Sequence, residues 1–134
     1  MPRIRIKGKR YTYKEDDVIS FGEGLIGLPQ IRRAVVLSMN EFKPFQWLVS
    51  VDNENYRFIV VNPNEIFESY QPALLGEFAG AKMQTLAIVK ISSDWRKTTI
   101  NLKAPIFINE ETMRAEQRVL TDGNYRLAES LPQN

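Results

Sequence analysis

Residues 45–62 of the chain read FQWLVSVDNENYRFIVVN, and this stretch contains the pattern that decides the fold. Two runs rich in β-branched and aromatic residues, 45–51 and 56–62, are separated by the four polar residues 52–55. Such runs favour β-strands, and Asp and Asn between them favour a reversal of the chain. The stretch therefore predicts a hairpin of two antiparallel strands.

Further runs of the same kind surround this hairpin: AVVLS (34–38), TLAIVKI (85–91), TINLKA (99–104), PIFIN (105–109) and AEQRVLT (115–121). Residues 109–114 and the sequence Asp122-Gly123-Asn124 are expected to reverse the chain. Many short strands at close spacing indicate a small barrel or sandwich. We therefore expect residues 1–134 to form a single, mainly β domain, a small antiparallel β-barrel with one short helix.

The helix is expected over residues 72–81, where its apolar face would consist of Leu74, Leu75, Phe78 and Ala79. Gly76 and Gly80 weaken this pattern because glycine is a poor helix former. The tail, residues 130–134, is expected to be frayed.

The composition excludes several kinds of chemistry. The sequence has no cysteine and no histidine, so disulfides, thiolate metal sites and Ser-His-Asp or Cys-His catalysis are excluded. A carboxylate enzyme would need two converging acids, for which Glu65 and Glu68 are the nearest candidates. The acidic run 15–17 is better interpreted as a solvated turn than as a metal site. We expect no enzymatic activity, no cofactor and no metal.

No apolar run approaches the roughly 18 residues that a membrane helix requires. The N-terminus also lacks the apolar stretch of a secretory signal. We therefore expect a cytoplasmic protein.

Positive charge is concentrated at the N-terminus. Residues 1–14 carry six basic residues and no acidic one, which leaves 12 basic and 16 acidic residues in the rest of the chain. This basic arm could contact nucleic acid, with Tyr11 and Tyr13 as stacking surfaces. Ile4 and Ile6, however, alternate with basic residues, which is typical of a half-buried strand with a charged outer face. We favour the strand and keep a small RNA-binding β-barrel as the alternative.

The loop at residues 22–27, GEGLIG, formally matches the G-x-G-x-x-G phosphate-binding pattern. That motif requires a following helix and a parallel strand, whereas Pro29 and a new strand near residue 34 leave no room for the helix. We therefore interpret the glycines as a tight turn that lets Phe21, Leu25 and Leu28 reach the core.

Residues 21–29, FGEGLIGLP, resemble a phrase near the start of the FliW family of flagellar assembly factors. Three further segments are similar to that family in the same order: PFQWLVSVD (44–52), FIVVNP (58–63) with Tyr70 downstream, and NLKAPIFIN (101–109) followed by Gln117 and Leu120. The resemblance covers about residues 17–128, and its last segment is the most specific. The chain departs from the family at Val49, where a Gln is usual, and in its basic arm.

The resemblance implies a non-enzymatic cytoplasmic binding protein with chaperone-like and translation-regulating roles. FliW-like proteins bind flagellin or, alternatively, the RNA-binding repressor CsrA, whose repression of flagellin mRNA they relieve. The acidic excess outside residues 1–14 is compatible with a cationic repressor as partner. We expect a monomer when unbound, with no direct contact to nucleic acid or membrane.

Residues 99–109 suggest one partner-binding surface. Their apolar residues alternate with a mainly polar set, and Pro105 donates no ladder hydrogen bond, which favours an edge or a bulge. The residues of this candidate docking edge are Asn101, Lys103, Pro105 and Asn109. An equally weighted interpretation is that Asn101 and Asn109 only satisfy backbone groups in local turns.

The irregular stretch after residue 62 suggests a second surface. Glu65 and Glu68 would meet a cationic partner there, and Phe67 and Tyr70 would serve as apolar anchors. The alternative is that the two glutamates form only a solvated face.

Overall fold

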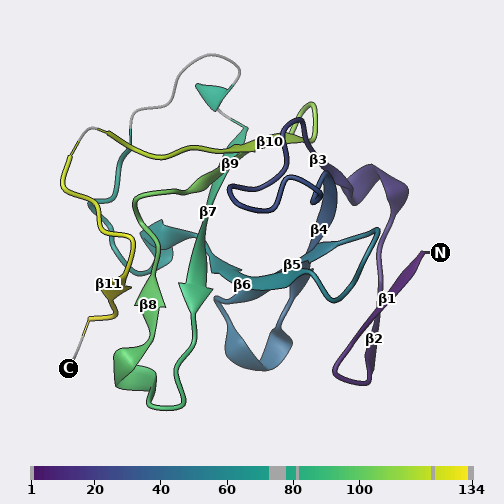
Figure 1. Cartoon of the computed structure of the whole chain (residues 1–134), viewed down its shortest axis with the longest axis horizontal. Coiled ribbons are helices and arrows are strands. Elements are labelled where there is room, and N and C mark those ends of the chain that lie inside the picture. The colour runs from purple at the N-terminus through teal and green to yellow at the C-terminus, as the bar shows by residue number, and fades with distance from the viewer. Residues whose placement is uncertain (1, 73–77, 81, 122, 133–134) are drawn as a thin grey trace.

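The computed structural model describes residues 2–72, 78–80, 82–121 and 123–132 (Figure 1). Its strands are β1 (Arg3–Ile6), β2 (Lys9–Thr12), β3 (Ile19–Phe21), β4 (Arg33–Ser38), β5 (Gln46–Ser50), β6 (Arg57–Val61), β7 (Met83–Lys90), β8 (Thr99–Ile100), β9 (Ile106–Asn109), β10 (Arg114–Gln117) and β11 (Glu129–Ser130). Short 3-10 turns are η1 (Glu15–Asp17), η2 (Asn40–Phe42), η3 (Pro63–Glu65) and η5 (Trp95–Lys97). Within the described ranges, no helix is long and apolar enough to cross a membrane.

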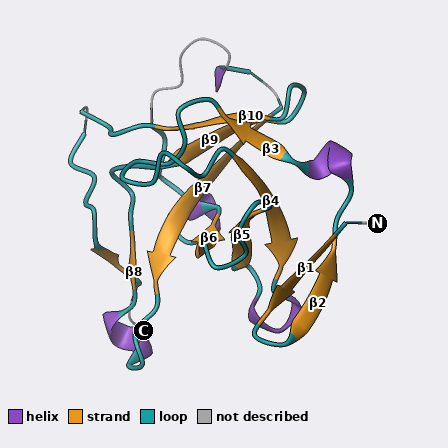
Figure 2. Cartoon of the chain, turned by 45° about the vertical axis from the view of Figure 1, so that its right-hand side comes forward, coloured by secondary structure: helices purple, strands orange, loops and turns teal. Residues whose placement is uncertain are grey.

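Seven strands close into a barrel in the order β7-β6-β5-β4-β3-β10-β9, and β9 pairs again with β7 (Figures 1 and 2). All of these pairs are antiparallel except β3 with β10, which run parallel. β7 closes the barrel because its first half, residues 83–86, pairs with β9, whereas Val89 and Lys90 pair with β8. The expected mainly β, barrel-like fold is confirmed, and the predicted hairpin is β5–β6.

The barrel interior is filled by side chains from each of its seven strands. This interior cluster consists of Ile19, Phe21, Leu25, Ile31, Ala34, Leu48, Val60, Leu86, Ile106, Ile108 and Ala115. Leu25 and Ile31 enter it from the glycine loop rather than from a strand. The interior is therefore a packed core.

The barrel wall is also buried on its outer face. In β4, Ala34 points into the interior cluster, whereas Val35 packs in a hairpin cluster made of Ile4, Ile6, Val35, Leu37 and Val49. In β6, Val60 points inward, whereas Val61 packs in an outer cluster made of Val61, Tyr70, Phe78, Ala87, Val89, Ile100, Leu102, Phe107 and Leu120. Strands buried on both faces are continuous apolar runs rather than alternating ones, as in residues 34–37 and 58–61.

The basic arm forms the β1–β2 hairpin, a separate two-stranded sheet. Ile4 and Ile6 are buried in the hairpin cluster against β4 and β5, while Arg3 and Arg5 are exposed. The prediction of a half-buried strand with a charged outer face is confirmed.

The strand expected over residues 99–104 is only two residues long, so the alternation expected across residues 99–109 is interrupted. β8 ends at Ile100 and β9 begins at Ile106, with an irregular stretch between them. By alternation Phe107 falls on the mainly polar face with Asn101 and Lys103, but it is fully buried in the outer cluster because other segments cover the wall there. Pro105 is buried as well.

Other expectations require correction near the C-terminus. β10 ends at Gln117 instead of continuing to residue 121. Ser130 is not frayed, because it pairs with Thr99 as part of β11. The helix expected over 72–81 falls largely on 73–77 and 81, which lie outside the described residues; Phe78 is buried.

Truncation of Leu102 tests the outer cluster. Leu102 is buried there, so Leu102→Ala is expected to lower the free energy of unfolding by about 2–5 kcal/mol in urea titrations. The neighbouring Lys103 is half-buried, and Lys103→Ala serves as the control, with an expected loss below about 1 kcal/mol. Equal losses for the two variants would contradict this packing.

Candidate functional site

The loop that follows β6 is held by its own side chains. The Asn62 side chain accepts a hydrogen bond from the Asn64 amide at 3.0 Å and so begins η3. The Asn64 side chain in turn donates to the carbonyl of Tyr70 at 2.7 Å. These bonds fix residues 62–70 in one conformation, which we call the 62–70 loop.

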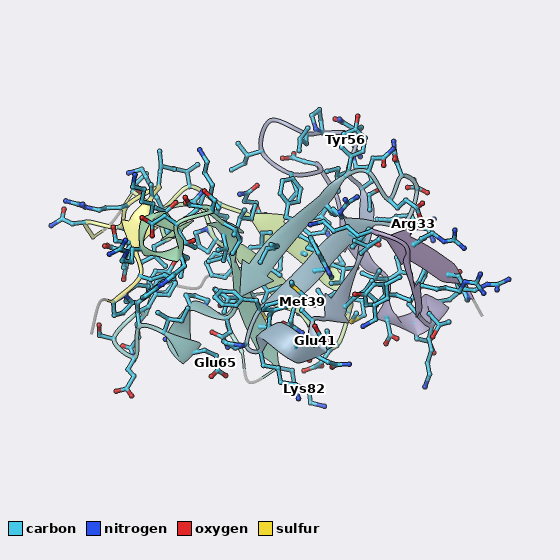
Figure 3. The ribbon with its side chains drawn as sticks, turned by 90° about the horizontal axis from the view of Figure 1, so that it is seen from below. Arg33, Met39, Glu41, Tyr56, Glu65 and Lys82 are labelled. Atoms are coloured by element: carbon cyan, nitrogen blue, oxygen red, sulfur yellow. The ribbon has the colours of Figure 1, made fainter. Side chains whose placement is uncertain are left out.

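The two glutamates of this loop face solvent. Glu65 and Glu68 are both exposed, and Figure 3 shows Glu65 at the margin of the barrel. Neither forms an ion pair among the described residues. Two unpaired carboxylates on a loop held in one conformation form a local negative surface.

Tyr70 is not available on that surface. It is 4% exposed, its hydroxyl donates to the carbonyl of Leu102 at 2.7 Å, and its ring meets Tyr125 edge-on at 4.8 Å. Phe67 is half-buried against the same outer cluster. The expectation that Tyr70 offers an exposed apolar anchor is corrected, because the ring is part of the core.

The candidate docking edge is occupied by local turns. The Asn101 side-chain oxygen accepts from the amides of Lys103 at 3.1 Å and Ala104 at 2.9 Å. The Asn109 side-chain oxygen accepts from the amide of Glu111 at 2.9 Å. These bonds favour the turn interpretation of both asparagines.

The structure brings only some of the eight predicted partner-binding residues close together. The Tyr70–Leu102 hydrogen bond places the 62–70 loop beside Asn101 and Lys103. Asn109 lies at the far end of β9, where it pairs with Arg114 and Met83. Buried Pro105 is not accessible, so the eight residues do not form one continuous surface.

The glycine loop has the role predicted from its sequence. Gly24 and Gly27 adopt φ values of +75° and +80°, and Leu25 forms a bridge with Leu28. Phe21 and Leu25 reach the interior cluster, with Leu28 packed against it. No helix follows the loop before β4. The tight-turn interpretation is confirmed.

Sequence reasoning missed a groove beside this loop. The groove has a volume of about 590 Å³ and lies between residues 22–29 and β10, with Phe78 also lining it. Its loop side is joined to β10 where the amide of Ile26 donates to the Gln117 side chain at 2.9 Å. The groove exists because the glycine loop packs beside Gln117. The spacing of residues in the sequence does not predict this long-range contact.

Metal ligands do not gather on the part of the chain that the structure describes. No group of three or more acidic residues is placed to hold a metal ion there. Glu15, in the acidic run 15–17, forms an ion pair with Arg33 at 3.6 Å, and Arg33 also meets Asp52. The acidic run is thus a solvated 3-10 turn.

The fold and the surface features place the protein in a structural class. It is a small, closed β-barrel protein in which a separate hairpin covers part of the wall and the candidate polar residues lie on loops. Residues 6–131 match the family described as FliW protein. The chain belongs to the FliW family.

Individual relatives agree with this assignment. A flagellar assembly factor FliW from Ruminiclostridium cellulolyticum is 32% identical over 120 residues, covering 84% of this chain and 81% of the relative. The Bacillus subtilis flagellar assembly factor FliW is 34% identical, covering 84% of this chain and 83% of the relative. A crystal structure of the flagellar assembly factor FliW superposes with a TM-score of 0.86 at 25% identity and 98% coverage of both chains.

The three glycines of the loop allow a graded test. A Cβ at Gly24 would lie 2.5 Å from the Pro29 carbonyl oxygen, whereas Gly22 and Gly27 have open space. We expect Gly22→Ala to change the free energy of unfolding by less than about 0.5 kcal/mol. Gly27→Ala should cost about 1–2 kcal/mol from its left-handed conformation alone, and Gly24→Ala more than that. Thermal unfolding of the three variants measures the order, and similar midpoints would contradict the loop geometry.

Proposed function

We propose that this protein is a non-enzymatic binding protein that holds either flagellin or a CsrA-type translational repressor. When flagellin is scarce, the protein binds the repressor and frees flagellin mRNA for translation. When flagellin accumulates, it occupies the protein and repression returns. The proposed site of action is the cytoplasm, and the unbound protein is proposed to be a monomer.

Similarity over nearly the whole chain carries this proposal. The family match runs from residue 6 to 131, and the relatives that it aligns with are named flagellar assembly factors. The loops and β2 of the hairpin fall within the match, so the similarity is not confined to a common barrel core. No cluster of metal ligands among the described residues competes with a binding role.

The 62–70 loop is the surface that we propose for the repressor. A protein that grips mRNA must present cations, and Glu65 and Glu68 offer unpaired, exposed carboxylates on a loop held by side-chain hydrogen bonds. Charges of this kind act mainly on the rate of association. Lys103, beside this loop, would sit at the edge of such a contact.

Calorimetry with purified partners from the same genome tests the function. We expect flagellin to bind with one-to-one stoichiometry, the repressor to bind in its absence, and each to displace the other. A labelled flagellin mRNA leader should not bind this protein by itself. Tight binding of that RNA, with no heat from flagellin, would instead support the small RNA-binding barrel.

Charge reversal tests the surface separately from the function. Glu65→Lys with Glu68→Lys should slow association with the repressor by about tenfold at low salt, and the difference should shrink as salt rises. The matched control reverses Glu110 and Glu111, which are also exposed and lie on the β9–β10 turn. Stopped-flow mixing measures both rates. A loss confined to the Glu110 and Glu111 variant would place the repressor at the Asn109 turn instead.

A further inference from the structure

The β1–β2 hairpin concentrates positive charge without balancing it. Its exposed cations are Arg3, Arg5, Lys7, Lys9 and Arg10. Arg5 lies directly opposite Arg10 in the strand register, an arrangement that destabilises a hairpin. Among the described residues, none of these five cations forms an ion pair. The stability of the hairpin alone does not explain this charge.

A pocket adjoins the hairpin. It has a volume of about 310 Å³ and lies between the β1–β2 turn and η2, which stand side by side in Figure 2. Buried Ile6 and half-buried Met39 and Trp47 line it, and Phe42 stands at its rim with 60% of its surface exposed. The lining also includes Lys7 and Lys9. The pocket is large enough for one large apolar side chain.

Two carboxylates lie close to this surface. Glu41 lines the pocket, and the Glu54 side chain accepts a hydrogen bond from the Arg5 amide at 3.0 Å. Lys7 and Lys9 together with Glu41 give the pocket a net charge of +1, and Arg3, Arg5 and Arg10 add positive charge on the opposite face of the hairpin. Its charge complements an acidic partner.

The aromatic rings favour a polypeptide over a nucleic acid. Single-stranded nucleic acids bind by stacking their bases on exposed ring faces. Here Lys9 Nζ lies 5.3 Å from the centroid of the Tyr11 ring, and the Arg57 guanidinium lies 5.8 Å from that of the Trp47 ring. Both half-buried rings thus already carry a cation on one face. An apolar side chain that fills the pocket, unlike a stacking base, does not need a free ring face.

We propose that the pocket between the β1–β2 turn and η2 docks an acidic segment of a partner polypeptide. The segment places one apolar side chain between Phe42 and Trp47, and its carboxylates face Lys7 and Lys9. This inference rests on the hairpin and its pocket, and it does not depend on the proposed binding of flagellin or the repressor.

Trp47 supplies a local signal for binding. The chain has two tryptophans, and Trp95 lies in η5, away from the pocket. In a Trp95→Phe background, Trp47 therefore reports on the pocket alone. The probe is a short synthetic peptide in which Asp and Glu flank one central Leu. Its addition is expected to shift Trp47 emission saturably, and binding should weaken as salt rises.

Two control peptides separate the contributions. Replacing Leu by Gly in the probe should abolish the emission shift, and replacing the acids by Lys should abolish binding. No saturable shift with the acidic Leu peptide overturns the proposal. A single-stranded RNA that binds more tightly than the peptide also overturns it.

Variants distinguish docking from a structural role. Lys7→Glu should weaken peptide binding by about tenfold while leaving the unfolding midpoint nearly unchanged, because Lys7 is exposed in the β1–β2 turn. Lys90→Glu, an exposed cation at the end of β7, is the matched control and should bind as the parent does. Phe42→Ala should also weaken binding without unfolding the exposed η2 turn. Equal affinities for Lys7→Glu and Lys90→Glu would overturn the assignment.

Discussion

Burial of the barrel wall on both faces is the constraint on which the rest of the structure depends. The interior of a closed barrel of short strands is large enough only for the side chains that point inward. Apolar side chains that point outward are therefore buried only where other segments pack on the outside of the barrel. Val35 and Val49 receive it from the β1–β2 hairpin, and Phe107 receives it from the loops around Tyr70. The loops and the hairpin are therefore part of the core, and their positions follow from the apolar residues that they cover.

The cover on the loop side is held by hydrogen bonds as well as by packing. The Tyr70 hydroxyl donates a hydrogen bond to the carbonyl of Leu102, which lies in the irregular stretch between β8 and β9. A buried carbonyl without a hydrogen-bond partner costs free energy, so this bond stabilises the stretch. Asparagines repeat the same solution at turns, where Asn62, Asn101 and Asn109 bond to backbone amides two or three residues ahead. Polar groups that look like binding residues in the sequence are thus used within the fold. The groups left for partners are mainly the exposed charges.

The sequence predicted the barrel because strand and turn propensities are local. It predicted the tight glycine turn for the same reason, since φ above zero and the space near Pro29 both require glycine at position 24. It failed at residues 99–109, because alternation cannot tell whether the second face of a strand is covered by a distant segment. Tyr70 was wrongly predicted to be an exposed anchor for the same reason. Its hydrogen-bond partner, Leu102, is 32 positions away in the sequence. Glu65 and Glu68 are exposed, as both interpretations of their stretch expect, whereas the groove beside β10 and the pocket beside η2 depend on tertiary contacts alone.

Positive charge is concentrated on the β1–β2 hairpin and negative charge on the 62–70 loop. This separation limits the ways in which two partners could compete for binding to the protein. The β1–β2 hairpin lies at one end of the long axis in Figure 1, and Figure 3 shows Glu65 of the 62–70 loop on the other side of the barrel's centre. They are attached to different parts of the wall, the hairpin over β4 and β5 and the loop at the end of β6. An acidic segment on the hairpin would leave Glu65 and Glu68 uncovered. Mutual exclusion therefore requires either that both partners overlap on the 62–70 side, or that the partner docked at the hairpin is large enough to extend along the barrel to that loop.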